Sequence, residues 1–250
     1  MSTPNPFETG GELYARARPT YPESLSGALG GLCEKHDLAV DIGCGTGQLT
    51  RLLARVFTRV IGVDPSEDQV ANADGAGNSS SGSVSYVVGS ASETTLPSAG
   101  ADLITAAQAA HWFDLPAFYA EAKRIAAPGA VLALITYGVP RLGEPHAKLF
   151  DDFYWGPIHD HWPAERGPVE QAYGNLEFPF ERLAIEAEPI RRDWSAEELL
   201  AYVRTWSASK RAIKAGQEGL IDGFAKELEA ASQGSTVAVS WPVTVLAARL

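Results

Sequence analysis

The sequence predicts an α/β fold with a doubly wound, mainly parallel sheet of seven strands. Three observations support this prediction. Short apolar runs alternate along the chain with helical segments, the pattern of parallel sheets with crossover helices. An apolar run at residues 38–42 leads directly into a glycine-rich turn at 43–47. A helical segment then leaves the turn at residue 48, so strand, turn and helix follow one another without a break.

The remaining elements are read from apolar periodicity and turn residues. Strands are expected at residues 38–42, 59–64, 84–88, 102–108, 130–137, 182–194 and 236–250, with an interruption of the last at Pro242. Helices are expected at residues 24–35, 48–54, 115–127, 195–206 and 219–231, with one more starting at Pro65 and Ser66. Ser195 and Glu198 have the spacing of a capping box.

Composition restricts the class of protein. The 250 residues are 45% hydrophobic and 20% charged, which indicates a globular chain with a full core. The net charge of −11 argues against nucleic acid as a partner, because phosphate contacts depend on Lys and Arg. No apolar run reaches about 20 residues, so no membrane-spanning segment is expected. Two cysteines and an N-terminus without signal-peptide features predict a cytoplasmic protein, and no oligomeric state is predicted.

The segment after the fifth expected strand differs from the rest. Residues 141–198 hold 13 acidic and 6 basic residues, a net of −7, together with many aromatic residues and prolines. We interpret residues 140–194 as an insertion that caps the functional edge of a single domain spanning 1–250.

Four features fall at the carboxyl ends of the expected strands. They are the glycine turn, Asp64, the turn at 89–91 and the segment 108–113. Ligands of open α/β sheets bind outside these ends. Glycine allows the backbone to approach a ligand closely, and a helix that starts there adds unpaired N–H groups. The sequence therefore predicts a binding site at this edge.

The glycine spacing separates two classes of ligand. A dinucleotide site needs its third glycine three positions after the second, where this chain has Gln48. The observed glycines are Gly43, Gly45 and Gly47, and the acidic Asp41 precedes them. A carboxylate beside a pyrophosphate is unfavourable, whereas S-adenosylmethionine carries a sulfonium and an ammonium and no phosphate. The spacing therefore favours S-adenosylmethionine over a dinucleotide.

Three stretches carry a family resemblance. Residues 40–47, 62–66 and 89–91 resemble the motifs of class I S-adenosylmethionine-dependent methyltransferases. The resemblance implies S-adenosylmethionine as cofactor and S-adenosylhomocysteine as product. Asp64, at the end of the second expected strand, is placed to accept hydrogen bonds from the ribose hydroxyls, with an ordinary helix cap as the other interpretation. The resemblance implies that the 89–91 turn contacts the adenine. The cofactor-binding residues predicted at this edge are Asp41, Gly43, Gly45, Asp64, Pro65, Ser90, Ala91 and Gln108.

A narrower resemblance covers more of the chain. Residues 14–22, 110–114 and 202–208 resemble the trans-aconitate methyltransferase-like branch, whose members include enzymes that esterify small carboxylic acids. The resemblance implies an N-terminal lid over residues 1–24. Within it, Arg18 or Tyr14 is predicted to bind the methionine carboxylate of the cofactor, and Tyr21 the acceptor. A solvated basic stretch is the other interpretation of these residues.

His111 is the candidate catalytic residue. It lies just past the fourth expected strand, and it can face the acceptor, serve as a general base or be structural. Trp112 and Trp206 are candidate acceptor-binding residues, although aromatic residues spaced four apart on a helix, such as Tyr202 and Trp206, also suit a core.

Two acceptor classes stay open. The resemblance favours the carboxylate oxygen of a small molecule, whereas the acidic segment favours an amine, for example an amino sugar of secondary metabolism. A cofactor-binding protein without methyl transfer and a nicotinamide-dependent oxidoreductase are the other classes considered, and the glycine spacing disfavours the latter. The alternating histidines His159 and His161 have no further clustered ligands, so no metal site is predicted.

Overall fold

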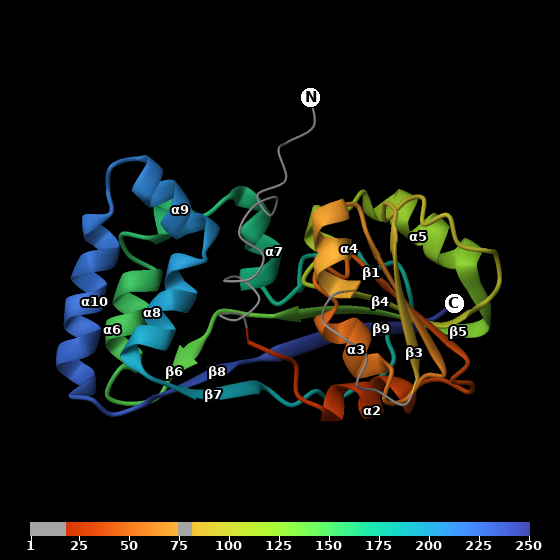
Figure 1. Cartoon of the computed structure of the whole chain (residues 1–250), viewed down its shortest axis with the longest axis horizontal. Coiled ribbons are helices and arrows are strands. Elements are labelled where there is room, and N and C mark those ends of the chain that lie inside the picture. Colours follow the sequence, from red (N-terminus) through yellow and green to blue (C-terminus); the bar gives the residue numbers. More distant parts are fainter. Residues whose placement is uncertain (1–18, 75–81) are drawn as a thin grey trace. The chain divides into compact units, whose positions relative to one another are not determined.

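The computed structural model describes residues 19–74 and 82–250. The chain forms two compact units, whose elements are labelled in Figure 1. The sheet unit comprises Thr20–Gly138, Pro168–Glu188 and Val243–Leu250. The second unit contains Val139–Gly167 and Pro189–Pro242. The segment expected as a cap, 140–194, is thus shared between the two units.

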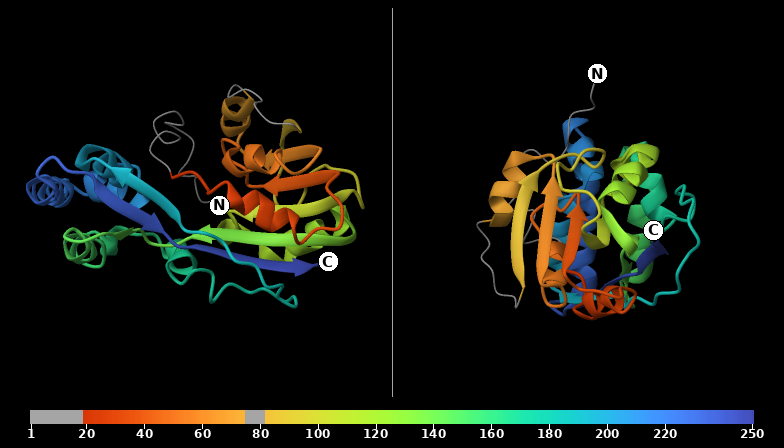
Figure 2. Two further views of the ribbon diagram at one scale, coloured as in Figure 1. Left: turned by 90° about the horizontal axis from the view of Figure 1, so that it is seen from below. Right: turned by 90° about the vertical axis from the view of Figure 1, so that its right-hand side faces the viewer.

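The sheet unit contains a six-stranded sheet in the order β3-β2-β1-β4-β5-β9. Its strands are β1 (Leu38–Ile42), β2 (Arg59–Asp64), β3 (Ser83–Val88), β4 (Ala101–Ala107), β5 (Ala126–Tyr137) and β9 (Val243–Arg249). All neighbours pair in parallel except β5 and β9, which are antiparallel. In the right-hand view of Figure 2 the arrows of β1, β2 and β3 point the same way. The predicted doubly wound α/β fold is confirmed.

Both faces of this sheet are covered, as its continuous apolar strands require. Its helices are α2 (Ser24–Gly30), α3 (Gln48–Leu53), α4 (Glu67–Asp74), η1 (Ala110–Trp112) and α5 (Leu115–Ile125), and the short α7 (Gly167–Glu170) follows the second unit's first segment. On one face Val40 and Ile42 of β1 join a core with Phe118 of α5. On the other face Ala39 joins a core with residues of α2 and α3. The alternation of β1 side chains therefore places one helix layer on each side.

The second unit has its own small sheet and an aromatic core. Its elements are β6 (Arg141–Leu142), α6 (Ala147–Tyr154), η2 (His159–His161), η3 (Ala164–Arg166), β7 (Ile190–Trp194), α8 (Ala196–Arg204), α9 (Ser207–Lys214), α10 (Gly219–Ser232) and β8 (Val237–Trp241). The strands pair antiparallel in the order β6-β8-β7. Phe153 of α6 stacks on Phe224 of α10 with ring centroids 4.2 Å apart. The capping box at Ser195 and Glu198 is present at the start of α8.

The strand count differs from the prediction of seven strands in one sheet. The segment expected as the sixth strand, 182–194, yields β7, which pairs with β8 in the smaller sheet. Its first part follows the edge of the large sheet, but only Leu183 pairs there, with Ala247 of β9. Pro189 ends this stretch and has no N–H to donate to a ladder. The large sheet therefore has six strands among the described residues.

Element boundaries also differ from the prediction. The last expected strand is interrupted at Pro242, as predicted, but its halves β8 and β9 belong to different sheets. The first helix ends at Gly30 instead of residue 35, and the ring of His36 lies 3.0 Å from the Gly30 carbonyl at that end. None of the helices in the described part of the chain has the length and apolar character needed to cross a lipid bilayer.

Candidate functional site

The candidate site lies where β1, β2 and β4 end. The loop between β1 and α3 carries three glycines in the left-handed region, with φ of 71° at Gly43, 53° at Gly45 and 77° at Gly47. A side chain at Gly43 would come within 2.6 Å of the methyl group of Ala109, and one at Gly47 would collide with the Tyr86 hydroxyl. Both positions therefore exclude side chains by packing as well as by backbone conformation.

Gly45 differs from the other two glycines. A Cβ atom there would meet only the side-chain oxygen of Gln69, at 3.9 Å. The described residues leave the space next to this backbone open, which allows a ligand to approach it. Absence of a side chain at Gly45 thus fits the close approach expected for a cofactor.

Asp64 ends β2 and fixes the loop beside it. Its Oδ2 accepts a hydrogen bond from the Gly45 amide at 2.9 Å, and its Oδ1 accepts one from the Ser66 amide at 3.0 Å. The side chain is 8% exposed. A carboxylate has about four acceptor positions, so these two bonds leave capacity for hydroxyl donors of a ligand. Pro65 separates Asp64 from the first residues of α4.

Asp41 lies within the sheet at β1. Its two carboxylate oxygens accept hydrogen bonds from the hydroxyls of Thr50 on α3, at 2.7 Å, and Thr105 on β4, at 2.8 Å. Burial raises the pKa of Asp41 to about 6, against the opposing effect of the two hydroxyls. The contacts of Asp41 therefore join three elements under the glycine loop, and its binding to the cofactor stays a prediction.

The turn after β3 holds the other predicted cofactor residues. The backbones of Ser90 and Glu93 exchange hydrogen bonds of 3.1 and 3.3 Å, which closes the turn. Ser90 is exposed, and Ala91 is half-buried against the core of the sheet unit. This turn follows the end of β3 directly, on the same edge of the sheet as Asp64, because β2 and β3 are parallel and in register.

Gln108 follows β4 in a conformation that non-glycine residues rarely adopt. Its φ is 53°. Its side-chain amide donates to the Tyr137 carbonyl at 3.0 Å and its amide oxygen accepts from the Thr136 hydroxyl at 2.9 Å. These bonds to the end of β5 maintain the strained backbone. Such strain is often found at functional sites.

His111 lies in η1, three residues after Gln108. Its Nδ1 is 2.9 Å from the hydroxyl of Tyr173, a fully buried residue of the sheet unit. Trp112, beside it, is 41% exposed. Sequence reasoning missed Tyr173, because it lies 62 residues from His111 in an aromatic-rich segment with no local motif.

The remaining predicted residues are dispersed. Tyr14 and Arg18 lie outside the described residues. Tyr21 is half-buried in the sheet unit, edge-on to Tyr137 at 6.0 Å between ring centroids. Trp206 belongs to the second unit, where it is buried among aromatic rings that include Phe150. Its role in binding an acceptor stays a prediction.

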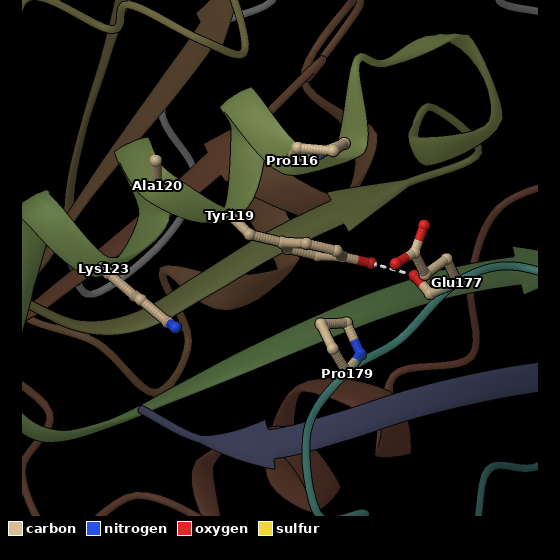
Figure 3. A pocket seen from close by; sticks show the side chains of 6 residues that line it. All are labelled: Pro116, Tyr119, Ala120, Lys123, Glu177 and Pro179. Carbon is tan, nitrogen blue, oxygen red and sulfur yellow. Dashed lines mark hydrogen bonds between the residues drawn. The ribbon is translucent and has the colours of Figure 1, made fainter.

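Two further features bear on ligands. Among residues 19–74 and 82–250 there is no group of three or more potential metal-ligating side chains. A surface pocket of about 330 Å³ lies along α5, where the Tyr119 hydroxyl donates to the Glu177 carbonyl at 2.6 Å (Figure 3). None of the predicted site residues lines this pocket.

Comparisons with known proteins agree with this geometry. A family model described as a methyltransferase domain matches residues 40–134. A candidate methyltransferase of Dictyostelium discoideum is 35% identical over 212 residues, which cover 83% of this chain and 79% of that protein. The solved structure of a candidate type II methyltransferase from Anaeromyxobacter dehalogenans is 39% identical with a TM-score of 0.83, over 93% of this chain and 97% of that one. A candidate methyltransferase from Bacillus halodurans, 18% identical with a TM-score of 0.54 over 91% and 99%, has the same fold.

Proposed function

The chain belongs to the class I S-adenosylmethionine-dependent methyltransferases, and we propose that it methylates an oxygen or nitrogen nucleophile of a small molecule. The observation that carries the cofactor assignment is the open backbone at Gly45, beside a carboxylate whose bonds to Gly45 and Ser66 fix it in place. S-adenosylmethionine supplies a methyl group already activated on a sulfonium. The protein then contributes alignment and exclusion of water for an in-line displacement.

The proposed contacts follow from the edge of the sheet. Asp64 accepts hydrogen bonds from the ribose hydroxyls through its remaining acceptor positions. The glycine loop faces the cofactor with its backbone, and the turn at Ser90 and Ala91 lies against the adenine. Gln108 is proposed as a further cofactor contact at this edge. Its strained backbone supports the proposal. Tyr14 and Arg18 are the proposed partners of the methionine carboxylate.

For the acceptor we propose a carboxylate oxygen. The proposal rests on the resemblance to the trans-aconitate methyltransferase-like branch at residues 14–22, 110–114 and 202–208. A carboxylate is ionised at neutral pH and needs no base before it attacks the methyl group. His111 with Trp112 is the proposed acceptor side of the sheet unit, and Tyr21 and Trp206 are proposed as further contacts.

An amine is the second candidate, and one observation favours it. Residues 141–198 carry a net charge of −7, which attracts cations and repels small polyanions. An ammonium has to lose a proton before it can attack, so this reaction requires a base. His111 is the candidate for that role. An amino sugar of secondary metabolism is an acceptor of this class.

The test is an acceptor panel with a chemical readout of the product. The purified chain is incubated with S-adenosylmethionine and trans-aconitate, a primary amino sugar or a phenol, and release of S-adenosylhomocysteine is measured. We expect turnover with the carboxylic acid and a methylated product that alkaline hydrolysis returns to the acid. Turnover with the amine alone, to a product that resists alkali, would overturn the carboxylate assignment.

A further inference from the structure

The proposed function assigns no role to the hydrogen bond between His111 and Tyr173. The Tyr173 hydroxyl lies 2.9 Å from Nδ1 of His111, and the two ring centroids are 6.0 Å apart. We propose that Tyr173 is a positioning residue for methyl transfer, which holds the His111 ring in one orientation and one tautomer. This proposal rests on the proposed function, because it assumes that His111 faces the acceptor.

The backbone around Tyr173 is arranged to present its hydroxyl. Ala172 and Tyr173 are consecutive non-glycine residues in the left-handed region, with φ of 50° and 59°. The Tyr173 amide donates to the Pro168 carbonyl at 2.7 Å, and the Tyr173 carbonyl accepts from the Leu176 amide at 3.1 Å. Side chains disfavour this conformation, so it persists only where the surroundings impose it. The fully buried ring then leaves the hydroxyl little freedom to move.

The bond to Nδ1 decides which atom of His111 can act. Because Tyr173 engages Nδ1, the chemistry that His111 offers an acceptor goes through Nε2. If the tyrosine donates to Nδ1, Nε2 carries the proton and is a hydrogen-bond donor, which suits a carboxylate. If the tyrosine accepts from Nδ1–H, Nε2 is a base, which suits an amine. With a carboxylate acceptor, the inference assigns the first arrangement: Tyr173 donates and Nε2 is protonated.

The same core offers a matched control. Tyr119 is also buried in the core that contains Tyr173, and its hydroxyl also makes a short hydrogen bond, to the Glu177 carbonyl at 2.6 Å. The acceptor of that bond is a backbone carbonyl and not a histidine ring. Tyr119→Phe therefore removes a buried hydroxyl without touching His111, whereas Tyr173→Phe removes the hydroxyl that contacts Nδ1.

The experiment reads the tautomer directly. The chain is labelled with ¹⁵N-histidine, and long-range ¹H–¹⁵N correlation spectra are recorded at about pH 8, above the ordinary pKa of histidine. His111→Ala identifies the His111 signals among the five histidines. We expect an unprotonated Nδ1 and a protonated Nε2 in the wild type and in Tyr119→Phe, and averaged nitrogen shifts in Tyr173→Phe.

A kinetic measurement connects the tautomer to catalysis. With trans-aconitate as acceptor, we expect Tyr173→Phe to lower kcat about tenfold, because a His111 ring that is no longer held in one orientation aligns the acceptor carboxylate less well. KM for S-adenosylmethionine should be unchanged. Tyr119→Phe should keep kcat within about twofold of the wild type, because its bond touches no proposed site residue.

Two results would overturn the proposal. They are unchanged His111 shifts in Tyr173→Phe, or changed shifts with unchanged kcat. A protonated Nδ1 in the wild type would overturn the assignment of Tyr173 as the donor and would indicate the second arrangement. The spectra require no acceptor. Failure of the carboxylate assignment, which is seen in the acceptor panel, is therefore distinguishable from failure of the His111–Tyr173 coupling.

Discussion

The two ends of the six-stranded sheet each hold a carboxylate that binds two backbone amides. At the carboxyl end Asp64 accepts from Gly45 and Ser66 at 2.9 and 3.0 Å. At the amino end Asp102 accepts from the amides of residues 37 and 38 at 2.8 and 3.0 Å. Each side chain is 8% exposed. A buried carboxylate that accepts from two amides therefore stabilises the backbone at both ends. Its presence does not by itself indicate a ligand-binding site.

The surroundings of Asp64 and Asp102 differ in the conformation and packing of the backbone. The loop beside Asp64 has three glycines in the left-handed region, and the part of the chain that the structure describes leaves the space next to Gly45 open. Asp102 instead accepts from the amides at the start of β1, a strand packed on both sides by its neighbours. The comparison teaches that the candidate site is defined by loop backbone, with the carboxylate as its support.

The largest effect is expected for a matched pair of substitutions, Asp64→Asn and Asp102→Asn. At Asp64 the two amides bond different oxygens, so the NH₂ group of an asparagine opposes one of them, and Asp64→Asn should lose about 1–3 kcal/mol of unfolding free energy. At Asp102 both amides bond Oδ2, so the asparagine oxygen can accept from both, and Asp102→Asn should lose less. Only Asp64→Asn should also weaken the binding of S-adenosylhomocysteine. We expect its Kd to rise roughly 30–100-fold, because the ribose contact is lost and the loop is displaced. Calorimetric titration and urea unfolding measure the two quantities.

Equal affinity in the wild type and Asp64→Asn would remove Asp64 from the cofactor site. A comparable loss of affinity in Asp102→Asn would show that the effect is transmitted through general destabilisation of the sheet. Either result would break the distinction between the two ends.

A second prediction concerns the cost in stability of burying the ionised Asp41 at the carboxyl end of the sheet. Burial raises the pKa of Asp41 to about 6 from an ordinary value of 3.8, so the folded state binds this proton more tightly than the unfolded state. The contribution of Asp41 to stability therefore falls as the pH rises from about 4 to about 6. Asp41→Asn lacks this titration. Its unfolding free energy, relative to the wild type, should rise by about 2–3 kcal/mol between pH 4 and pH 7.

Urea unfolding at several pH values measures this difference. The wild-type titration of all other groups cancels in the comparison of the two proteins. A difference that does not change with pH would mean that Asp41 ionises in the folded protein as it does in water.

The smallest effect is expected for Gly45→Ala and Gly129→Ala. Both glycines have positive φ, 53° and 79°, and at each a Cβ would meet only the end of a flexible side chain, at 3.9 Å. Gly129 lies near the amino end of β5. Each substitution should therefore cost about 1 kcal/mol of unfolding free energy. Gly45→Ala alone should also raise the Kd for S-adenosylhomocysteine, because its methyl group enters the space proposed for the cofactor. Equal Kd values in the two variants would place the cofactor elsewhere.

The elements that the sequence predicted well depend on local patterns. The strand at 38–42, the glycine turn and Asp64 lie within residues 38–64, and their spacing can be read without knowing the fold. The motif also identified the class of cofactor. The cores of both units were not predicted residue by residue, because aromatic residues in 141–198 have no regular spacing that assigns them to one unit.

The features that sequence reasoning missed arise from long-range packing. Tyr173 reaches His111 across 62 residues, and nothing in either segment indicates the other. The positive φ of Gln108 depends on bonds to the end of β5, which form only in the folded sheet. The missing seventh strand depends on where the chain leaves the sheet unit at Pro189, which apolar alternation at Leu183 does not show.

The division of the chain has a consequence for engineering. Between residues 20 and 250 the chain passes from one unit to the other four times, and prolines at 168, 189 and 242 adjoin three of these passages. A chimera that takes the second unit of a relative must therefore exchange two separate segments, 139–167 and 189–242, and keep 168–188 from the recipient. The retained segment carries Tyr173, so the exchange would test a new second unit against an unchanged pair of His111 and Tyr173.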